Sequence, residues 1–141
     1  MRSFLKILAA TTFMVIMFSG CTKDNDPQTN ATIEGLWIGT YTVDGYPNLG
    51  QQYFSFIIKP DGTMINDTKA ENKQHIALGT WTLTGNAFSS SFKCIYGLPV
   101  NIGITETSTA TLDKAGKLTG TWSNIAPLTG GGTITLTKVP E

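Results

Sequence analysis

The chain has few arginine, cysteine and histidine side chains, and these shortages exclude several classes of function. Its only arginine is Arg2, its only histidine is His75, and it has two cysteines among 141 residues. Without Arg2 and Lys6 at the N-terminus, eight lysines face ten acidic residues, a net charge of −2. A weakly acidic domain without arginine lacks both a phosphate-neutralising patch and the guanidinium fork that reads guanine, so we expect no nucleic-acid binding.

Motifs of catalytic and metal sites are also missing. The sequence contains no G-x-S-x-G and no H-E-x-x-H motif. Glu106 lies within an extended segment without an evident carboxylate partner, and we interpret it as a solvent-facing charge. The one histidine, His75, belongs to a loose polar cluster with Asp67 and Glu71 that we interpret as a solvated loop. The sequence therefore predicts no enzyme, no cofactor and no metal ion.

No apolar run is long enough to cross a membrane as a helix. The longest, at residues 7–18, has twelve residues, whereas a spanning helix needs roughly 18 to 20. It follows two positive charges near the N-terminus and precedes a Ser-Gly pair, which is the order of a signal peptide. We therefore predict a signal peptide at residues 1–20.

The residue after this segment is Cys21, and "FSGC" (18–21) resembles the lipobox of bacterial lipoproteins. The resemblance implies cleavage before Cys21, diacylation of its sulfur and acylation of its new amino group by palmitate-type chains. Each buried methylene contributes about 0.8 kcal/mol, so two or three chains anchor a protein firmly. An uncleaved anchor or a plain secreted protein is the alternative.

Residues 21–32 are polar, contain one proline and show no periodicity, so we expect a flexible tether from the lipidated cysteine. Thr22 stands where an aspartate would signal retention in the inner membrane. The tract "KDND" (23–26) resembles the charged tract of surface lipoproteins of the Bacteroidota. We predict an outer-membrane lipoprotein and leave open the periplasmic face or the cell surface.

With Cys21 lipidated, Cys94 is the only thiol left, so no disulfide can form within the chain. A small exported domain without a disulfide depends on its hydrophobic core for stability. We interpret Cys94 as a buried, inert thiol.

Alternating apolar residues and closely spaced turns indicate an all-β domain over residues 33–141. Turns such as "PDGT" (60–63) and "TGN" (84–86) contain the Gly, Asp and Asn residues that tight turns favour. Eight short strands in sequence order predict an eight-stranded antiparallel up-and-down barrel, with a two-sheet sandwich as the alternative. The expected strands are 35–43, 52–59, 63–66, 75–83, 87–96, 100–113, 118–123 and 132–139.

Three tryptophan motifs resemble a known family. "GLWIGTY" (35–41) carries the G-x-W that opens the first strand of calycins, the group that includes lipocalins. "GTWTLTGNAF" (79–88) and "LTGTWS" (118–123) are similar to lipocalin-like lipoproteins of the Bacteroidota. The resemblance implies a lipocalin-like barrel in which a basic residue of the last strand, here Lys138, covers Trp37 by a cation–π contact.

This barrel is expected to bind a small apolar or amphipathic ligand. Ser90 and Tyr96 are candidate polar contacts for it, and the three tryptophans are either pocket walls or core anchors. The residues expected to point inward are Trp37, Tyr41, Phe54, Phe56, Trp81, Phe88, Ser90, Phe92, Tyr96 and Trp122.

The alternative is a filled barrel whose loops bind a partner protein or glycan of the cell envelope. The candidate loops are 44–51, with Tyr46 exposed, 67–74 and 124–131. A cavity inside the barrel would favour the first function, and a filled interior the second.

Overall fold

A computed structural model describes residues 32–140 of the chain. The predictions of a signal peptide, of lipidation at Cys21 and of the tether up to residue 31 lie outside the described residues. Within residues 32–140, no helix has both the length and the apolar character needed to span a membrane.

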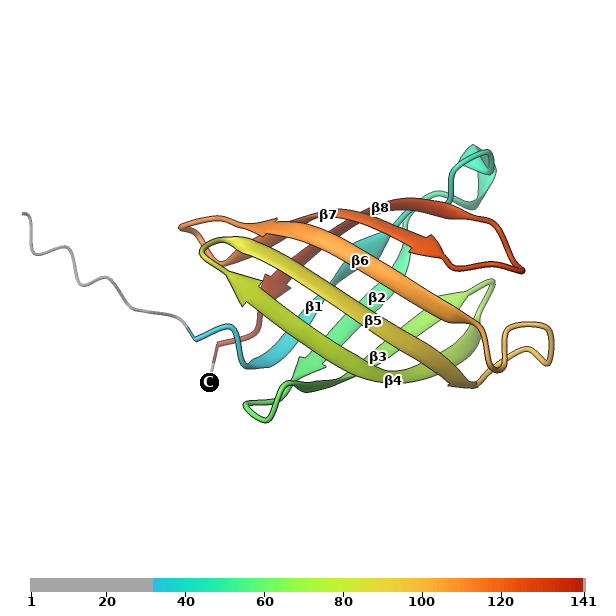
Figure 1. Cartoon of the computed structure of the whole chain (residues 1–141). Helices are drawn as coiled ribbons and strands as arrows, with labels where there is room; N and C mark the ends of the chain where they lie inside the picture. The colour runs from blue at the N-terminus through green and yellow to red at the C-terminus, as the bar shows by residue number, and fades with distance from the viewer. Residues whose placement is uncertain (1–31, 141) are drawn as a thin grey trace, which may run out of the picture.

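Eight antiparallel strands form one closed barrel, in which each strand pairs with its neighbours in sequence and the last pairs with the first (Figure 1). The predicted barrel is thus confirmed over the sandwich. In order, the elements are β1 (Gly35–Tyr41), the short 3-10 helix η1 (Pro47–Leu49), β2 (Gln52–Ile58), β3 (Thr63–Ala70), β4 (Lys73–Thr84), β5 (Ala87–Tyr96), β6 (Thr105–Leu112), β7 (Lys117–Asn124) and β8 (Gly131–Lys138).

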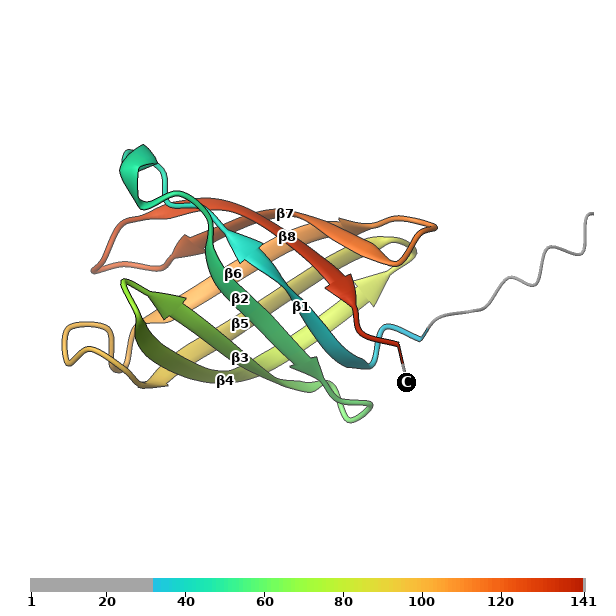
Figure 2. The same ribbon diagram turned by 180° about the vertical axis from the view of Figure 1, so that it is seen from behind.

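The barrel has two different ends. The terminal end carries Thr32, the last described residue Pro140 and the β2–β3, β4–β5 and β6–β7 turns (Figure 2). The loop end, on the opposite side, carries η1 and the β1–β2, β3–β4, β5–β6 and β7–β8 connections. The chain therefore enters and leaves at one end, and its longer connections gather at the other.

The core follows the alternation of the strands. Along β5, for example, Phe88, Ser90, Phe92 and Cys94 are buried and the residues between them are exposed. Burying each large apolar side chain contributes roughly 1.5–3 kcal/mol, which stabilises the barrel without a disulfide. The side chains exposed by 2% or less that fill the middle and the terminal end include Trp37, Phe56, Ile58, Met64, Phe88, Phe92, Leu118 and Leu136.

This core and every strand pairing of the barrel lie within residues 33–138. No contact with residues 1–31 is needed to close the sheet or to bury the core residues. A chain that begins at Thr22 therefore contains every strand and every core residue of the barrel, and it is the soluble chain used in the tests below.

The predicted loop at 67–74 is wrong. β3 continues to Ala70 and β4 begins at Lys73, and only Glu71 and Asn72, with φ of 51° and 64°, form the turn. Two successive positive φ values are the geometry of a type I′ hairpin turn. Polar residues on both faces of this hairpin hid the alternation, because the backbone pairing of Thr68 with His75 does not depend on apolar side chains.

The predicted strand 100–113 begins later than expected. β6 starts at Thr105, and residues 97–104 form a loop that folds back onto the end of β5. In this loop the Gly103 amide donates to the Cys94 carbonyl oxygen (2.8 Å), and the Cys94 amide donates to the Ile104 carbonyl oxygen (2.9 Å). Gly103 adopts a φ of 88°, which interrupts an extended chain and favours glycine.

Candidate functional site

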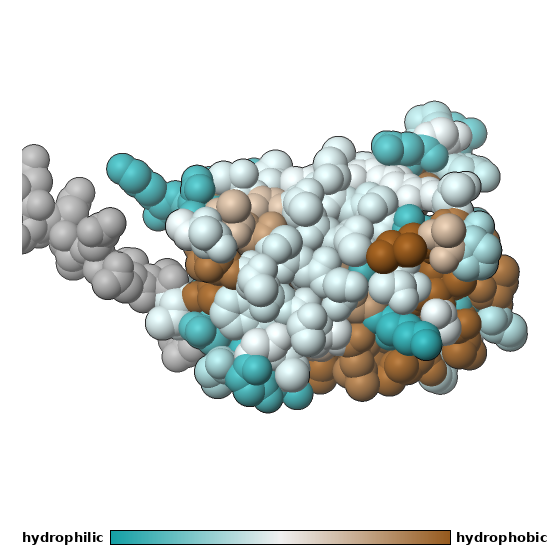
Figure 3. Space-filling model, in the orientation of Figure 1, coloured by the Kyte–Doolittle hydropathy of each residue, from teal (hydrophilic) through white to brown (hydrophobic). Residues whose placement is uncertain are grey.

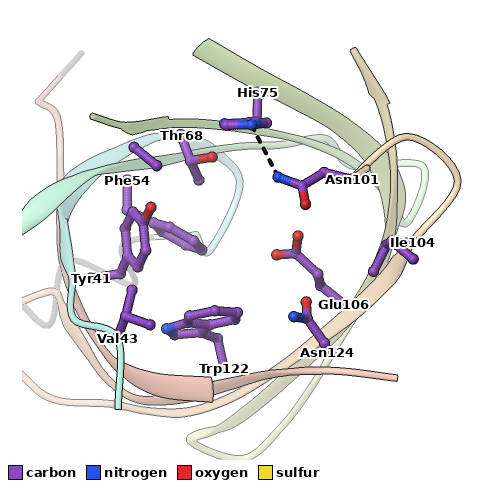
Figure 4. A pocket seen from close by; sticks show the side chains of 11 residues that line it. Tyr41, Val43, Phe54, Thr68, His75, Asn101, Ile104, Glu106, Trp122 and Asn124 are labelled. Carbon is purple, nitrogen blue, oxygen red and sulfur yellow. Dashed lines mark hydrogen bonds between the residues drawn. The ribbon is translucent and has the colours of Figure 1, made fainter. Parts of the chain in front are cut away.

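The barrel is hollow at its loop end, where a cavity of about 200 Å³ lies among six strands and the β5–β6 loop (Figure 4). Phe54 connects it to the aromatic core, because its ring packs against that of Phe56 with centroids 4.9 Å apart. Its walls divide into an apolar and a polar part. The residues that line it are Tyr41, Val43, Phe54, Thr68, Ala70, His75, Asn101, Ile104, Glu106, Trp122 and Asn124.

Aromatic rings from three strands make the apolar wall. Tyr41 of β1 packs edge-on against Trp122 of β7, with ring centroids 5.6 Å apart, and lies 5.7 Å from Phe54 of β2. The Trp122 indole is held in place because its Nε1 donates to the Thr42 carbonyl oxygen at 2.8 Å. Opposite Trp122 on β8 is Gly132, where a Cβ atom would overlap the Thr42 carbonyl oxygen and approach Trp122 Nε1 within 2.9 Å.

Polar groups occupy the facing wall. Figure 4 shows the side chains of Glu106, Asn101 and Asn124 pointing into the cavity from the side opposite Tyr41 and Val43. Glu106 and Asn124 are direct neighbours on β6 and β7, and Asn101 comes from the β5–β6 loop. One carboxyl and two amide groups thus face the aromatic rings across the cavity.

Glu106 points inward, so its interpretation as a solvent-facing charge is wrong. Ser108 and Ala110, two and four residues further along β6, are buried on the same face of the strand. Burial raises the pKa of the Glu106 carboxyl group to about 7. Burial, with a smaller contribution from the charge of Glu106, raises the pKa of Tyr41 to about 12.

His75 is buried rather than solvated, with an exposed fraction of 8%. Its Nε2 lies 3.1 Å from Nδ2 of Asn101, which joins the β5–β6 loop to β4 beside the cavity (Figure 4). Burial lowers the pKa of His75, so the ring is neutral near pH 7. Within residues 32–140, no three His, Cys, Asp or Glu side chains are placed to hold a metal ion.

The predicted inward residues divide between the cavity and the core. Tyr41, Phe54 and Trp122 line the cavity. Trp81 lies at the terminal end, where its Nε1 donates to the Lys59 carbonyl oxygen at 2.9 Å. Ser90 is buried without a hydrogen-bond partner for its hydroxyl group and does not line the cavity. The remaining buried members fill the core: Trp37, Phe56, Phe88 and Phe92.

The prediction that Tyr96 points inward is wrong, since 59% of this side chain is exposed. Ile76 pairs with Tyr96, but the next residue of β4, Ala77, pairs with Cys94. One extra residue, Ile95, is therefore accommodated on β5 as a bulge, and a bulge shifts the alternation of the residues that follow it.

Lys138 of β8 and Trp37 of β1 are direct cross-strand neighbours, but the predicted cation–π contact between them is wrong. Lys138 Nζ donates to the Thr32 carbonyl oxygen at 2.7 Å. The only cation–π contact among residues 32–140 joins Lys69 to the ring of Tyr53. A strong carbonyl acceptor beside the ammonium group replaces the ring as its partner.

Cys94 is buried, as predicted, and its thiol lies 3.4 Å from the Tyr96 carbonyl oxygen. Burial raises the pKa of this thiol, so it stays protonated at neutral pH.

The polar wall is the part of the site that sequence reasoning missed. The inward direction of Glu106 could have been inferred from the sequence, because Ser108 and Ala110 lie two and four residues further along the same strand and therefore on the same face. Asn124 shares an alternation with Trp122 in the same way. For Asn101 no local pattern was available, since its position depends on how the β5–β6 loop folds.

Comparisons with known proteins identify no family for this chain. No protein-family model matches the sequence, and no curated protein matches it.

Proposed function

We propose that this chain is a lipid-anchored lipoprotein of the cell envelope whose lipocalin-like barrel binds a small amphipathic ligand in the cavity at the loop end. The observation that supports this function is the two-sided cavity. Tyr41, Phe54 and Trp122 offer apolar surface, and Glu106 and Asn101 face them with polar groups. Binding sites commonly combine an apolar lining with a few such polar contacts.

The cavity volume limits the size of the ligand. Sites for drug-sized molecules measure roughly 300–1,000 Å³, and an apolar cavity of about 150 Å³ holds benzene. A cavity of about 200 Å³ therefore suits one ring with a short polar substituent, and it is too small for a whole fatty acid.

The position of the cavity suits an anchored receptor. The chain enters the barrel at the terminal end, and the cavity opens at the loop end. Anchoring through Cys21 would therefore attach the barrel at the end opposite the mouth of the cavity, so the tether would not cover the mouth.

The three tryptophans supply a test with its own control. Small aromatic alcohols such as 2-phenylethanol are titrated into the soluble chain while the indole N–H resonances are followed by NMR. We expect the Trp122 resonance to shift, because this indole lines the cavity, and the Trp81 resonance at the terminal end to stay unchanged. Equal shifts, or none with any small ring compound, would contradict binding in the cavity.

A second function is favoured by the apolar side chains around the mouth. Tyr96, Val100, Ile102 and Ile125 are 46–65% exposed, and Figure 3 shows hydrophobic side chains gathered at the loop end. Large exposed apolar groups of this kind mark protein contacts. A photo-crosslinker at Val100 in living cells should then form a discrete protein adduct, whereas the same group at the exposed Thr119 on the barrel wall should not.

A further inference from the structure

Glu106 is a carboxyl group in the cavity for which residues 32–140 supply no cationic partner. Among residues 32–140 no lysine reaches it: six of the seven lysines are exposed on the outer wall or in turns, and Lys138 binds Thr32 at the terminal end. The described chain has no arginine. Its neighbours on the flanking strands, Phe92 and Asn124, carry no charge. A buried carboxylate is costly unless a cation or hydrogen-bond donors compensate it.

The groups facing Glu106 are those that favour a cation. Figure 4 shows the carboxyl group directed toward the rings of Tyr41 and Trp122. Aromatic faces attract cations, Trp most strongly. The amide oxygens of Asn101 and Asn124 add acceptors beside the carboxylate. An ammonium group has three donors and could use the carboxylate and both amides.

Other classes of ligand fit less well. An anion would meet the carboxylate without any cation in the cavity to offset the repulsion. A divalent metal ion would find one carboxylate and two amides, and no cluster of three ligating acidic, His or Cys side chains exists within residues 32–140. The ligand itself is therefore the natural source of the missing positive charge.

We propose, on the basis of the function proposed above, that the cavity binds a small organic amine in its protonated form. The ammonium group would lie between the Glu106 carboxylate and the Tyr41 and Trp122 rings, and its apolar part would lie against Phe54 and Val43.

This arrangement couples binding to one proton. In the empty cavity burial raises the pKa of Glu106 to about 7, so roughly half of the molecules carry a protonated Glu106 at neutral pH. An ammonium ligand binds the ionised form and releases that proton. Affinity for the amine should therefore be about 30-fold weaker at pH 5.5 than at pH 8.

Two other titratable groups near Glu106 keep one protonation state over this range. Tyr41 on β1 stays neutral because its pKa is raised to about 12, and the buried Cys94 on β5 stays a thiol because its pKa is raised. His75 on β4 has a lowered pKa and is neutral near pH 7. The residues of β2, β3 and β7 that line the cavity do not titrate, and Glu106→Gln separates the contribution of Glu106 to the pH profile from that of His75.

The test compares ligands that differ in charge alone. Calorimetric titration of the soluble chain with 2-phenylethylamine, 2-phenylethanol and 3-phenylpropionate should rank the amine first, at least about tenfold tighter than the alcohol at pH 8. Glu106→Gln should lower the amine affinity to that of the alcohol and abolish its pH dependence. Glu71→Gln, which removes an exposed carboxylate at the same end of the barrel, should change neither.

A second readout does not depend on any variant. Titrations at pH 7 in buffers of different ionisation enthalpy should show release of about half a proton per bound amine and none with the alcohol. Equal affinity for the amine and the alcohol would overturn the amine proposal while leaving a ligand-binding barrel intact. If no compound of the series binds or shifts the Trp122 resonance, both the amine proposal and the proposed function fail.

Discussion

Replacing Glu106 with Gln should stabilise the empty barrel, but only above about pH 4.5, where the wild-type carboxyl group ionises in the unfolded state. Burial raises the pKa of Glu106 from 4.5 to about 7, so the folded state favours the protonated form. Below pH 4.5 Glu106 is protonated in both the folded and the unfolded state, and the folded state keeps its full stability. As the pH rises from 4.5 through 7, the unfolded state ionises first, and this part of the free energy of unfolding is lost. The difference between the two pKa values corresponds to about 3 kcal/mol, the largest effect expected for a cavity that water can enter.

Glutamine has nearly the same shape and does not titrate. The free energy of unfolding of Glu106→Gln minus that of the wild type should be near zero at pH 4, rise between pH 4.5 and 7, and then level off at about 3 kcal/mol. Urea denaturation of the soluble chain at pH 4, 5.5, 7 and 8.5, followed by tryptophan fluorescence, measures this difference.

The control is Glu71→Gln, which removes an exposed carboxylate from the β3–β4 turn. Its effect on stability should stay within about 0.5 kcal/mol at every pH. A difference between Glu106→Gln and the wild type that does not change with pH would refute the reasoning, because it would mean that Glu106 is as well solvated in the folded state as in the unfolded state.

Three further predictions concern other parts of the chain. Cys21→Ser should move the protein from the membrane to the soluble fraction, and mass spectrometry of the wild type should find acyl chains on this residue; an unmodified wild-type N-terminus would contradict lipidation. Cys94 should react with a thiol reagent only when urea unfolds the barrel, because it is 3% exposed; rapid labelling of the native soluble chain would show that it is accessible. Gly39→Ala should cost about 2 kcal/mol or more in urea denaturation, because the new methyl group overlaps the Thr135 carbonyl oxygen on the neighbouring strand; an unchanged unfolding midpoint would show that β1 and β8 can separate freely there.

Local patterns were enough to predict the architecture. Alternation along the chain identified the strands, and Gly, Asp and Asn residues marked turns such as the one at Gly85. Both signals involve residues a few positions apart, so they can be interpreted without knowing what packs against them. The same alternation placed Phe88 and Phe92 correctly in the interior.

Two features of the fold depend on how neighbouring strands pair and could not be predicted from local patterns. The bulge opposite Ile76 and Ala77 turned Tyr96 outward, and such an irregularity exists only in the relation of two strands. The β3–β4 hairpin is similar, because its polar residues pair through the backbone and give no apolar signal.

The sequence by itself determined that the chain alternates into eight strands with an aromatic interior, because strand periodicity is a local property. Only the tertiary structure decided which inward residues meet. Closure of the barrel gathers Trp37, Phe56 and Leu118 into a filled core and leaves Glu106 facing Trp122 across a hollow end. The register between strands sets those distances, and no single strand contains that information.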